Sequence, residues 1–145
     1  MSMINDIICN ELQACDFIDF AVLFGSVVAN KTTPVSDVDI GIYTSRNISL
    51  VELGLLVYRI EVIIKRKIDI VVMNDIYKKR PAFAYEIVKN GVVLFCKDPE
   101  GFIEFKKKAI LYYLDNKYLT DEIDRRFKER LKSGRFGERN YVGAV

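Results

Sequence analysis

Residues 36–43 follow a pattern that constrains the fold more than any other stretch of the chain. Apolar side chains alternate there with polar or small ones: Val38, Ile40 and Ile42 with Asp37, Asp39 and Gly41. A period of two is that of a β-strand with one face in the core. Asp37 and Asp39 therefore project together from the opposite face, with roughly 6.5 Å between their Cα atoms. Whatever fold the chain adopts must hold two carboxylates side by side on one strand.

Other stretches predict strands and helices in alternation. The continuous apolar run of residues 20–24 stops at Gly25, as a buried strand does at a turn. Ser49 and Glu52 have the spacing of a capping box, which starts a helix. The expected strands are 20–24, 36–43, 68–73 and 92–95, and the expected helices are 4–15, 49–64, 81–90 and 98–132, the last with a break near Asn116. This order indicates an α/β (α+β) fold in which helices flank the sheet and a helical extension follows it.

The chain is predicted to be one domain with an extension. No segment repeats at a fixed period, and the three prolines are scattered. We expect a core over residues 1–97, a helical extension of the same domain over 98–132, and a flexible Gly-rich tail over 133–145. Residues 101–145 hold 11 basic and 7 acidic side chains, against 11 and 13 in residues 1–100. A partner surface is therefore expected first in the basic last third.

Composition excludes several classes of mechanism. The 145 residues carry a net charge of +2, too little for a protein that neutralises a run of phosphates, and we expect no direct nucleic-acid binding. The chain has no histidine, which removes the most common general base and the catalytic triads that depend on it. Catalysis by this chain has to rest on carboxylates.

The cysteines and the N-terminal residues indicate a reducing compartment. Three cysteines without CxxC spacing argue against a disulfide framework and against a structural zinc site. No apolar run reaches the roughly eighteen residues of a membrane span. Asp6 and Glu11 stand where a signal peptide would be apolar. We expect a cytoplasmic protein with no membrane association.

Asp69 adds a third carboxylate from the next predicted strand. An acid in so apolar a strand costs several kcal/mol unless it lies at the strand's exposed mouth, pairs with Lys67 or Arg66, or binds a metal. Asp37 and Asp39 can likewise be no more than the solvent face of a sheet. Three carboxylates at one sheet edge nevertheless make the oxygen-rich site that Mg²⁺ prefers.

The Gly25–Ser26 pair favours the functional interpretation of these acids. Glycine lets the backbone approach a ligand closely, and the amides and hydroxyl that follow can hold phosphate oxygens. Ten residues separate the pair from Asp37-Val38-Asp39. Strand, Gly-Ser turn, loop and Asp-x-Asp strand together resemble the signature of the nucleotidyltransferase superfamily that includes DNA polymerase β, in its minimal nucleotidyltransferase (MNT) branch. Asp69 matches the third acid of that signature.

The resemblance extends over about residues 4–132. Residues 83–95 and 112–119 are similar to the MntA-type antitoxins, MNT proteins that pair with HEPN ribonuclease toxins. This likeness implies a mixed β-sheet and a magnesium-dependent nucleotidyltransferase with two metal ions. It also implies transfer of AMP from ATP to a tyrosine of the HEPN-domain toxin, which neutralises the toxin's ribonuclease activity.

The resemblance assigns roles to the site residues. Asp37 and Asp39 would bridge both Mg²⁺ ions. Asp69 would complete the ion that activates the acceptor hydroxyl and would take its proton. Gly25 with Ser26 would hold the β- and γ-phosphates as pyrophosphate leaves. None of these roles needs a histidine.

One departure concerns the cation for the triphosphate. Family members often carry an arginine and then a glycine after the Gly-Ser pair, where this chain has Ala29 and Asn30. Lys31 is the nearest candidate to replace that arginine. The alternative is that Lys31 is a solvated lysine of the loop with no role in the site. Without such a replacement, activity is expected to be lower.

Two other functions stay open at this level. A small-molecule nucleotidyltransferase of the aminoglycoside-modifying type would use the same carboxylates, and a non-catalytic antitoxin would neutralise its toxin by binding alone. Intact acids at all three positions argue against lost catalysis. One small domain favours an acceptor that brings its own binding surface.

Two apolar lines along residues 102–118 are candidates for that contact. The first line is Phe102, Phe105, Ala109 and Tyr112, and the second is Ile103, Ile110 and Leu114. Two apolar lines predict two buried faces of this helix. Either both faces pack in the core of the chain, or one of them docks a partner.

Overall fold

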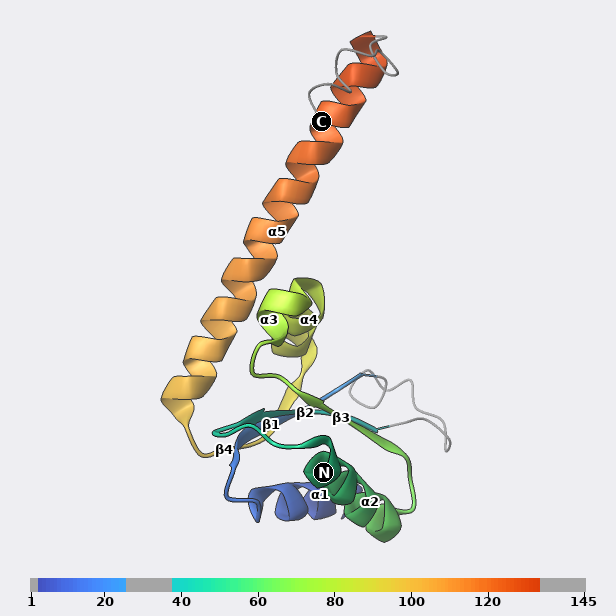
Figure 1. Cartoon of the computed structure of the whole chain (residues 1–145), viewed down its shortest axis with the longest axis vertical. Coiled ribbons are helices and arrows are strands. Elements are labelled where there is room, and N and C mark those ends of the chain that lie inside the picture. Colours follow the sequence, from blue (N-terminus) through green and yellow to red (C-terminus); the bar gives the residue numbers. More distant parts are fainter. Residues whose placement is uncertain (1–2, 26–37, 134–145) are drawn as a thin grey trace. The chain divides into compact units, whose positions relative to one another are not determined.

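The structure is a computed structural model that describes residues 3–25 and 38–133 (Figure 1). Two compact units divide the chain, Met1–Tyr113 and Leu114–Val145. The elements in chain order are α1 (Met3–Gln13), β1 (Ile18–Phe24), β2 (Val38–Thr44), α2 (Leu50–Ile64), β3 (Ile68–Val72), α3 (Ile76–Lys79), α4 (Pro81–Asn90), β4 (Val92–Cys96) and α5 (Pro99–Ser133). The α/β fold with flanking helices and a C-terminal helix is confirmed. The expected tail, apart from Ser133, lies outside the described residues.

Four strands form one mixed sheet in the order β3-β2-β1-β4. β1 is antiparallel to β2 and to β4, whereas β2 and β3 are parallel and are joined through α2. A parallel pair requires such a crossover connection. Within the described part of the chain, β3 and β4 are the edges of the sheet, so the expected edge strand at 92–95 is confirmed.

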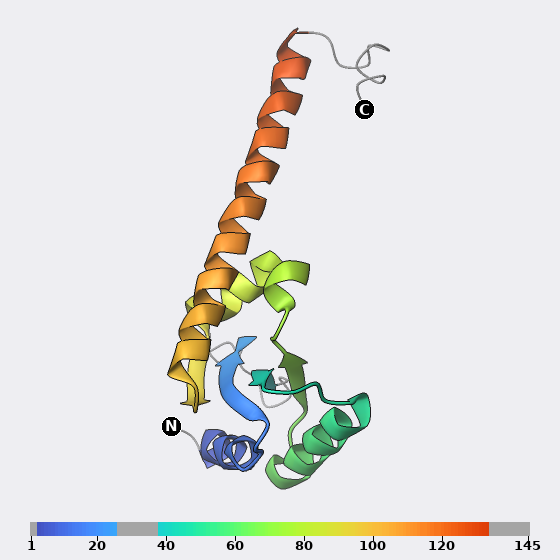
Figure 2. The same ribbon diagram turned by 60° about the vertical axis from the view of Figure 1, so that its left-hand side comes forward.

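The sheet has an apolar core on each face. α1 and α2 lie on one side of it, and α3 and α4 lie on the other, in both views of the ribbon (Figures 1 and 2). Val38, Ile40 and Ile42 of β2 pack in the core under α1 and α2. Phe20, Val22 and Phe24 of β1 pack in the other core, with α3, α4 and the start of α5. Because side chains alternate along a strand, the residues between Val38 and Ile42 face the second core.

Local signals in the sequence fix several helix ends. The capping box that opens α2 is present in full, because the Ser49 side chain accepts from the Glu52 amide and the Glu52 side chain accepts from the Ser49 amide. The Asp98 carboxylate accepts from the Gly101 amide at the start of α5. α4 begins at Pro81 and ends before Gly91, as expected for a proline in the first turn and a glycine past the last.

The helices differ from the expectation in two places. The expected break near Asn116 is wrong: α5 is continuous there, because asparagine is only a mildly poor helix former. α3 is not expected from the sequence. It is a single turn of four residues, too short to show a helical period.

The two apolar lines of α5 have different environments. Phe105 is 3% exposed and Ala109 is fully buried, and the Tyr112 ring contacts the Tyr77 ring with centroids 5.0 Å apart. Ile103 and Ile110 of the second line are exposed, Ile103 by 54%. Phe105 and Ala109 of the first line therefore belong to the core of the first unit, whereas Tyr112 is 41% exposed, and Ile103 and Ile110 of the second line are surface in that unit. No helix in the described ranges combines the length and apolar character of a membrane span.

Candidate active site

Asp39 and Asp69 occupy paired positions on neighbouring parallel strands. Asp39 is the register partner of Asp69 in β3 and of Phe24 in β1. Paired residues of adjacent strands project from the same face of a sheet. Asp39 is half-buried and Asp69 is exposed. These two side chains, the carboxylate pair, therefore lie side by side on the face that carries α3, α4 and the start of α5.

Gly25 closes β1 directly beside the carboxylate pair. Its φ is +84°, a left-handed conformation that suits glycine. A Cβ atom placed on Gly25 would lie 2.2 Å from Oδ2 of Asp39. The backbone turn and the Asp39 carboxylate are thus in contact, and any larger residue would displace that carboxylate. The structure shows close approach of the Gly25 backbone to the Asp39 carboxylate, and its approach to a ligand stays a prediction.

Three of the residues expected in the site lie outside the described residues. They are Ser26, Lys31 and Asp37, and Ala29 and Asn30 lie in the same segment. The structure places Gly25, Asp39 and Asp69 together. Among residues 3–25 and 38–133, no group of three His, Cys, Asp or Glu side chains is close enough to hold a metal ion. The described residues supply two of the three expected carboxylates.

A cluster of cations joins α3 to α4 on the same face of the sheet. Lys78, Lys79 and Arg80, the basic junction, are all exposed. The Arg80 guanidinium lies 4.2 Å above the Phe83 ring, and that ring meets the Phe24 ring edge-on with centroids 5.4 Å apart. Arg80 is absent from the site expected from the sequence. Its only signal there is a run of three basic residues before Pro81.

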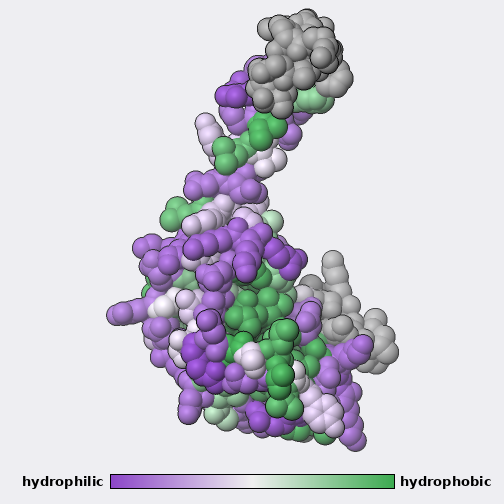
Figure 3. All heavy atoms as spheres, viewed as in Figure 1, coloured by the Kyte–Doolittle hydropathy of each residue, from purple (hydrophilic) through white to green (hydrophobic). Residues whose placement is uncertain are grey.

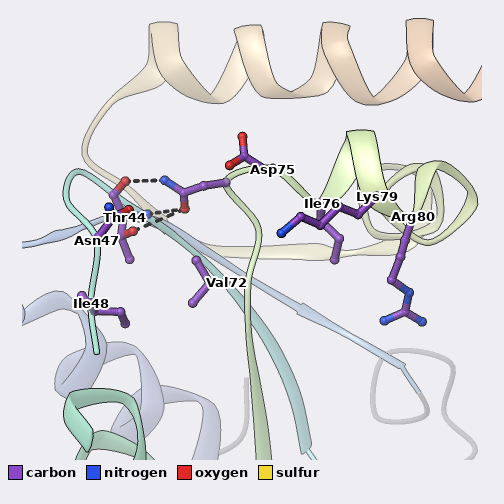
Figure 4. A pocket seen from close by; sticks show the side chains of 9 residues that line it. Thr44, Asn47, Ile48, Val72, Asp75, Ile76, Lys79 and Arg80 are labelled. Carbon is purple, nitrogen blue, oxygen red and sulfur yellow. Dashed lines mark hydrogen bonds between the residues drawn. The ribbon is translucent and has the colours of Figure 1, made fainter. Parts of the chain in front are cut away.

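A pocket of about 350 Å³ opens between the ends of β2 and β3 and the basic junction (Figure 4). Asn74 makes three hydrogen bonds with Thr44 at one side of it: the Thr44 amide and hydroxyl donate to Oδ1, and Nδ2 donates to the Thr44 carbonyl. Lys79 and Arg80 line the other side. Asp39 and Asp69 do not line the pocket, because they lie near the starts of β2 and β3 and the pocket lies at the ends of these strands.

Apolar side chains border this pocket toward α2. Figure 3 shows hydrophobic surface gathered between α3 and the start of α2. The outer face of α2 continues it with four exposed residues at coiled-coil-like spacing, Val51, Leu55, Tyr58 and Val62.

Tyr43 is a further titratable group on the face of the carboxylate pair. Burial raises the pKa of Tyr43, and the nearby charge of Lys108 lowers it less. Its ring stacks on the Phe20 ring, with centroids 4.8 Å apart. Tyr43 therefore packs at the edge of this core as a partly buried, neutral side chain.

A mixed sheet with a glycine turn packed against one of two neighbouring carboxylates agrees with the nucleotidyltransferase class. The sequence profile of the family described as Polymerase beta, Nucleotidyltransferase matches residues 6–100. The chain belongs to this family.

Solved structures with the same fold include toxin–antitoxin proteins. A chain of a toxin–antitoxin complex with AMP-PNP is 17% identical, with a TM-score of 0.70 over 86% of this chain and 98% of that one. A chain of the MntA–HepT toxin–antitoxin complex is 16% identical, with a TM-score of 0.66 over 88% and 99%. The tri-AMPylated Shewanella oneidensis HEPN toxin in complex with MNT antitoxin gives 16% identity and a TM-score of 0.65 over 87% and 97%. No curated protein sequence matches.

Proposed function

We propose that this chain is an antitoxin that works as a magnesium-dependent nucleotidyltransferase, moving AMP from ATP to a tyrosine of a partner HEPN-domain toxin and so neutralising it. The observation that carries the proposal is the carboxylate pair with Gly25 packed against Asp39. Membership of the nucleotidyltransferase family supports the reaction class. The fold shared with antitoxins, one of them bound to an AMPylated toxin, supports the acceptor.

The carboxylate pair fits a divalent cation. Like charges at paired positions of neighbouring strands repel one another, and a bound cation relieves that repulsion. The donors are oxygens only, which suits Mg²⁺ rather than a softer metal. Asp39 and Asp69 would hold it together with Asp37, and the metal would supply charge neutralisation for the attacking and leaving oxygens.

The residues of the chain then perform the remaining steps. Asp69, the exposed member of the carboxylate pair, accepts the proton of the acceptor hydroxyl. The hydroxyl oxygen forms a bond to the α-phosphorus of ATP, and the bond from that phosphorus to the bridging oxygen of pyrophosphate breaks. Gly25 allows the backbone to approach the departing phosphates, where Ser26 and Lys31 are the further proposed contacts. Cytoplasmic action follows from the ATP requirement.

A protein acceptor is supported by the exposed apolar surface of the first unit. The outer face of α2 and the line through Ile103 and Ile110 on α5 are both exposed. A small-molecule acceptor, such as an aminoglycoside, needs no such surface. A partner protein would bury it.

The test is incubation of the chain with labelled ATP, Mg²⁺ and the HEPN-domain protein encoded beside it, followed by mass spectrometry of the partner's tyrosines. We expect AMP on tyrosine with wild type and none with the Asp39→Asn/Asp69→Asn double variant. Asp75→Asn, which removes an exposed acid at the pocket, is the matched control and should act as wild type. Full toxin neutralisation by the double variant would show that the antitoxin works by binding alone. Transfer only to a small molecule would favour the aminoglycoside-type function.

A further inference from the structure

Arg80 carries a charge that the described part of the fold leaves unneutralised. Its backbone amide donates to the Ile76 carbonyl at 2.7 Å, which fixes the main chain at the junction of α3 and α4. Its guanidinium lies over the Phe83 ring and makes no ion pair or side-chain hydrogen bond with a residue in the described ranges. An exposed arginine that lies over a ring, and whose guanidinium has no protein acceptor in the described ranges, is available to bind an anion.

Two aromatic rings connect this guanidinium to the carboxylate pair. Phe83, under Arg80, meets Phe24 edge-on at an angle of 74° between the rings. Phe24 is the register partner of Asp39 and the residue before Gly25. In Figure 4 the Arg80 side chain points from the start of α4 toward the end of β1. Arg80 therefore lies at the same end and on the same face of the sheet as the glycine turn.

The other two cations of the basic junction lack this connection. The Lys78 ammonium lies 5.9 Å from the centroid of the Tyr77 ring, within the aromatic cluster at the start of α5. Lys79 lines the same pocket as Arg80, at the ends of β2 and β3, but has no ring contact in the described part of the structure. Of the three, Arg80 has a ring partner that touches the end of β1.

The charge of the substrate explains what Arg80 would bind. A nucleoside triphosphate brings more negative charge than a divalent cation at two or three carboxylates can neutralise. A guanidinium contributes a planar, bidentate contact to phosphate oxygens, which makes it suited to the terminal phosphates.

We propose that Arg80 binds the terminal phosphates of the nucleoside triphosphate at the carboxylate pair, with Phe83 as the positioning residue that holds its guanidinium. The identity of that triphosphate as ATP rests on the proposed function. Arg80 thus supplies a cation to the site from the junction of α3 and α4, outside the segment that follows Gly25.

The test compares the affinities of the full chain for ATP and for AMP in the presence of Mg²⁺, measured by titration calorimetry. Because Arg80 contacts the terminal phosphates, Arg80→Ala should weaken ATP binding by about tenfold or more and leave AMP binding within about twofold. Arg80→Lys should recover part of the ATP affinity. Phe83→Leu should weaken ATP binding less than Arg80→Ala and with the same selectivity.

A matched control is available in Arg46, which also lies over a phenylalanine ring. Its guanidinium is 4.6 Å from the centroid of Phe17, just before the start of β1 and so at the other end of that strand. Arg46→Ala should bind ATP as wild type does. If Arg80→Ala does not fold, Arg80→Gln keeps a polar side chain without the charge. It should show the same selective loss of ATP affinity.

Wild-type ATP affinity in Arg80→Ala or Arg80→Gln would overturn the proposal, and so would an equal loss of ATP and AMP binding. The outcome is separate from that of the proposed function. If wild type binds ATP in an Arg80-dependent way but transfers no AMP, the proposed reaction fails and the phosphate contact stands. If AMP is transferred and Arg80→Ala leaves the KM for ATP unchanged, the contact fails and the reaction stands.

Discussion

Gly25→Ala is the single substitution whose consequences the structure defines most closely. The new Cβ would lie 2.2 Å from Oδ2 of Asp39, and real Cβ contacts essentially never come under 3.0 Å. The carboxylate oxygen therefore has to move by roughly 1 Å, and a misplacement of that size at a reacting centre costs about a hundredfold in rate. The backbone adds strain, because φ is +84° and a left-handed conformation costs a non-glycine residue about 1–2 kcal/mol.

Two measurements separate these effects. The rate of AMP transfer should fall by about a hundredfold, whereas the free energy of unfolding in urea should fall by only about 1–2 kcal/mol, since a carboxylate at the end of a side chain can move without unfolding the sheet. Gly54→Ala is the matched control. A Cβ at Gly54, in the interior of α2, meets nothing within 4 Å, so the same chemical change should stabilise the chain by about 0.5–1 kcal/mol. A Gly25→Ala variant that is destabilised yet transfers AMP at the wild-type rate would refute the role of the Asp39 carboxylate.

Three further predictions test the packing and the charges around the sheet. Phe105→Ala should lower the free energy of unfolding by about 3–5 kcal/mol, whereas Ile103→Ala on the exposed side of α5 should change it by less than about 0.5 kcal/mol; equal losses would contradict the assignment of Phe105 to the core. Asn74→Ala removes the hydrogen-bond partners of the buried Thr44 and should lower the free energy of unfolding by about 1–3 kcal/mol in the same urea assay. An unchanged free energy of unfolding would contradict the role of these hydrogen bonds. The hydrogen bond from Arg46 holds the pKa of Glu52 at about 2, below its ordinary 4.5, so the stability it contributes is present above pH 4.5 and is lost as the pH falls toward 2. Glu52→Gln should therefore flatten the loss of stability across that window in acid titrations followed by circular dichroism, and an unchanged slope would argue against the pair.

Helix ends with local chemistry could be predicted closely. Pro81 and the Asn90–Gly91 pair give the bounds of α4, and the Ser49–Glu52 capping box gives the start of α2. α3 has no such local signal and depends on the contacts that bury Ile76 under the sheet. No break forms at Asn116, because the weak helix propensity of asparagine does not end a helix without a proline or glycine nearby.

The pairing of Asp39 with Asp69 could not be predicted from the sequence alone. The period of two fixes the face from which Asp39 projects, but a register shift by two residues keeps that face and would separate Asp39 from Asp69. Their pairing depends on the whole parallel contact of β2 with β3. The place of Arg80 beside β1 was even less predictable. It depends on the contact of Arg80 with Phe83 and on that of Phe83 with Phe24, a residue far away in the chain.

The central claim is that the carboxylate pair serves nucleotidyl transfer, and ATP labelled at either its α- or its γ-phosphorus tests it most directly. With wild type and the HEPN-domain partner, label from the α position should become bound to the partner protein, and label from the γ position should leave with pyrophosphate. The Asp39→Asn/Asp69→Asn variant should transfer neither. Label from the γ position on the partner, or undiminished transfer of the α label by the double variant, would contradict the account.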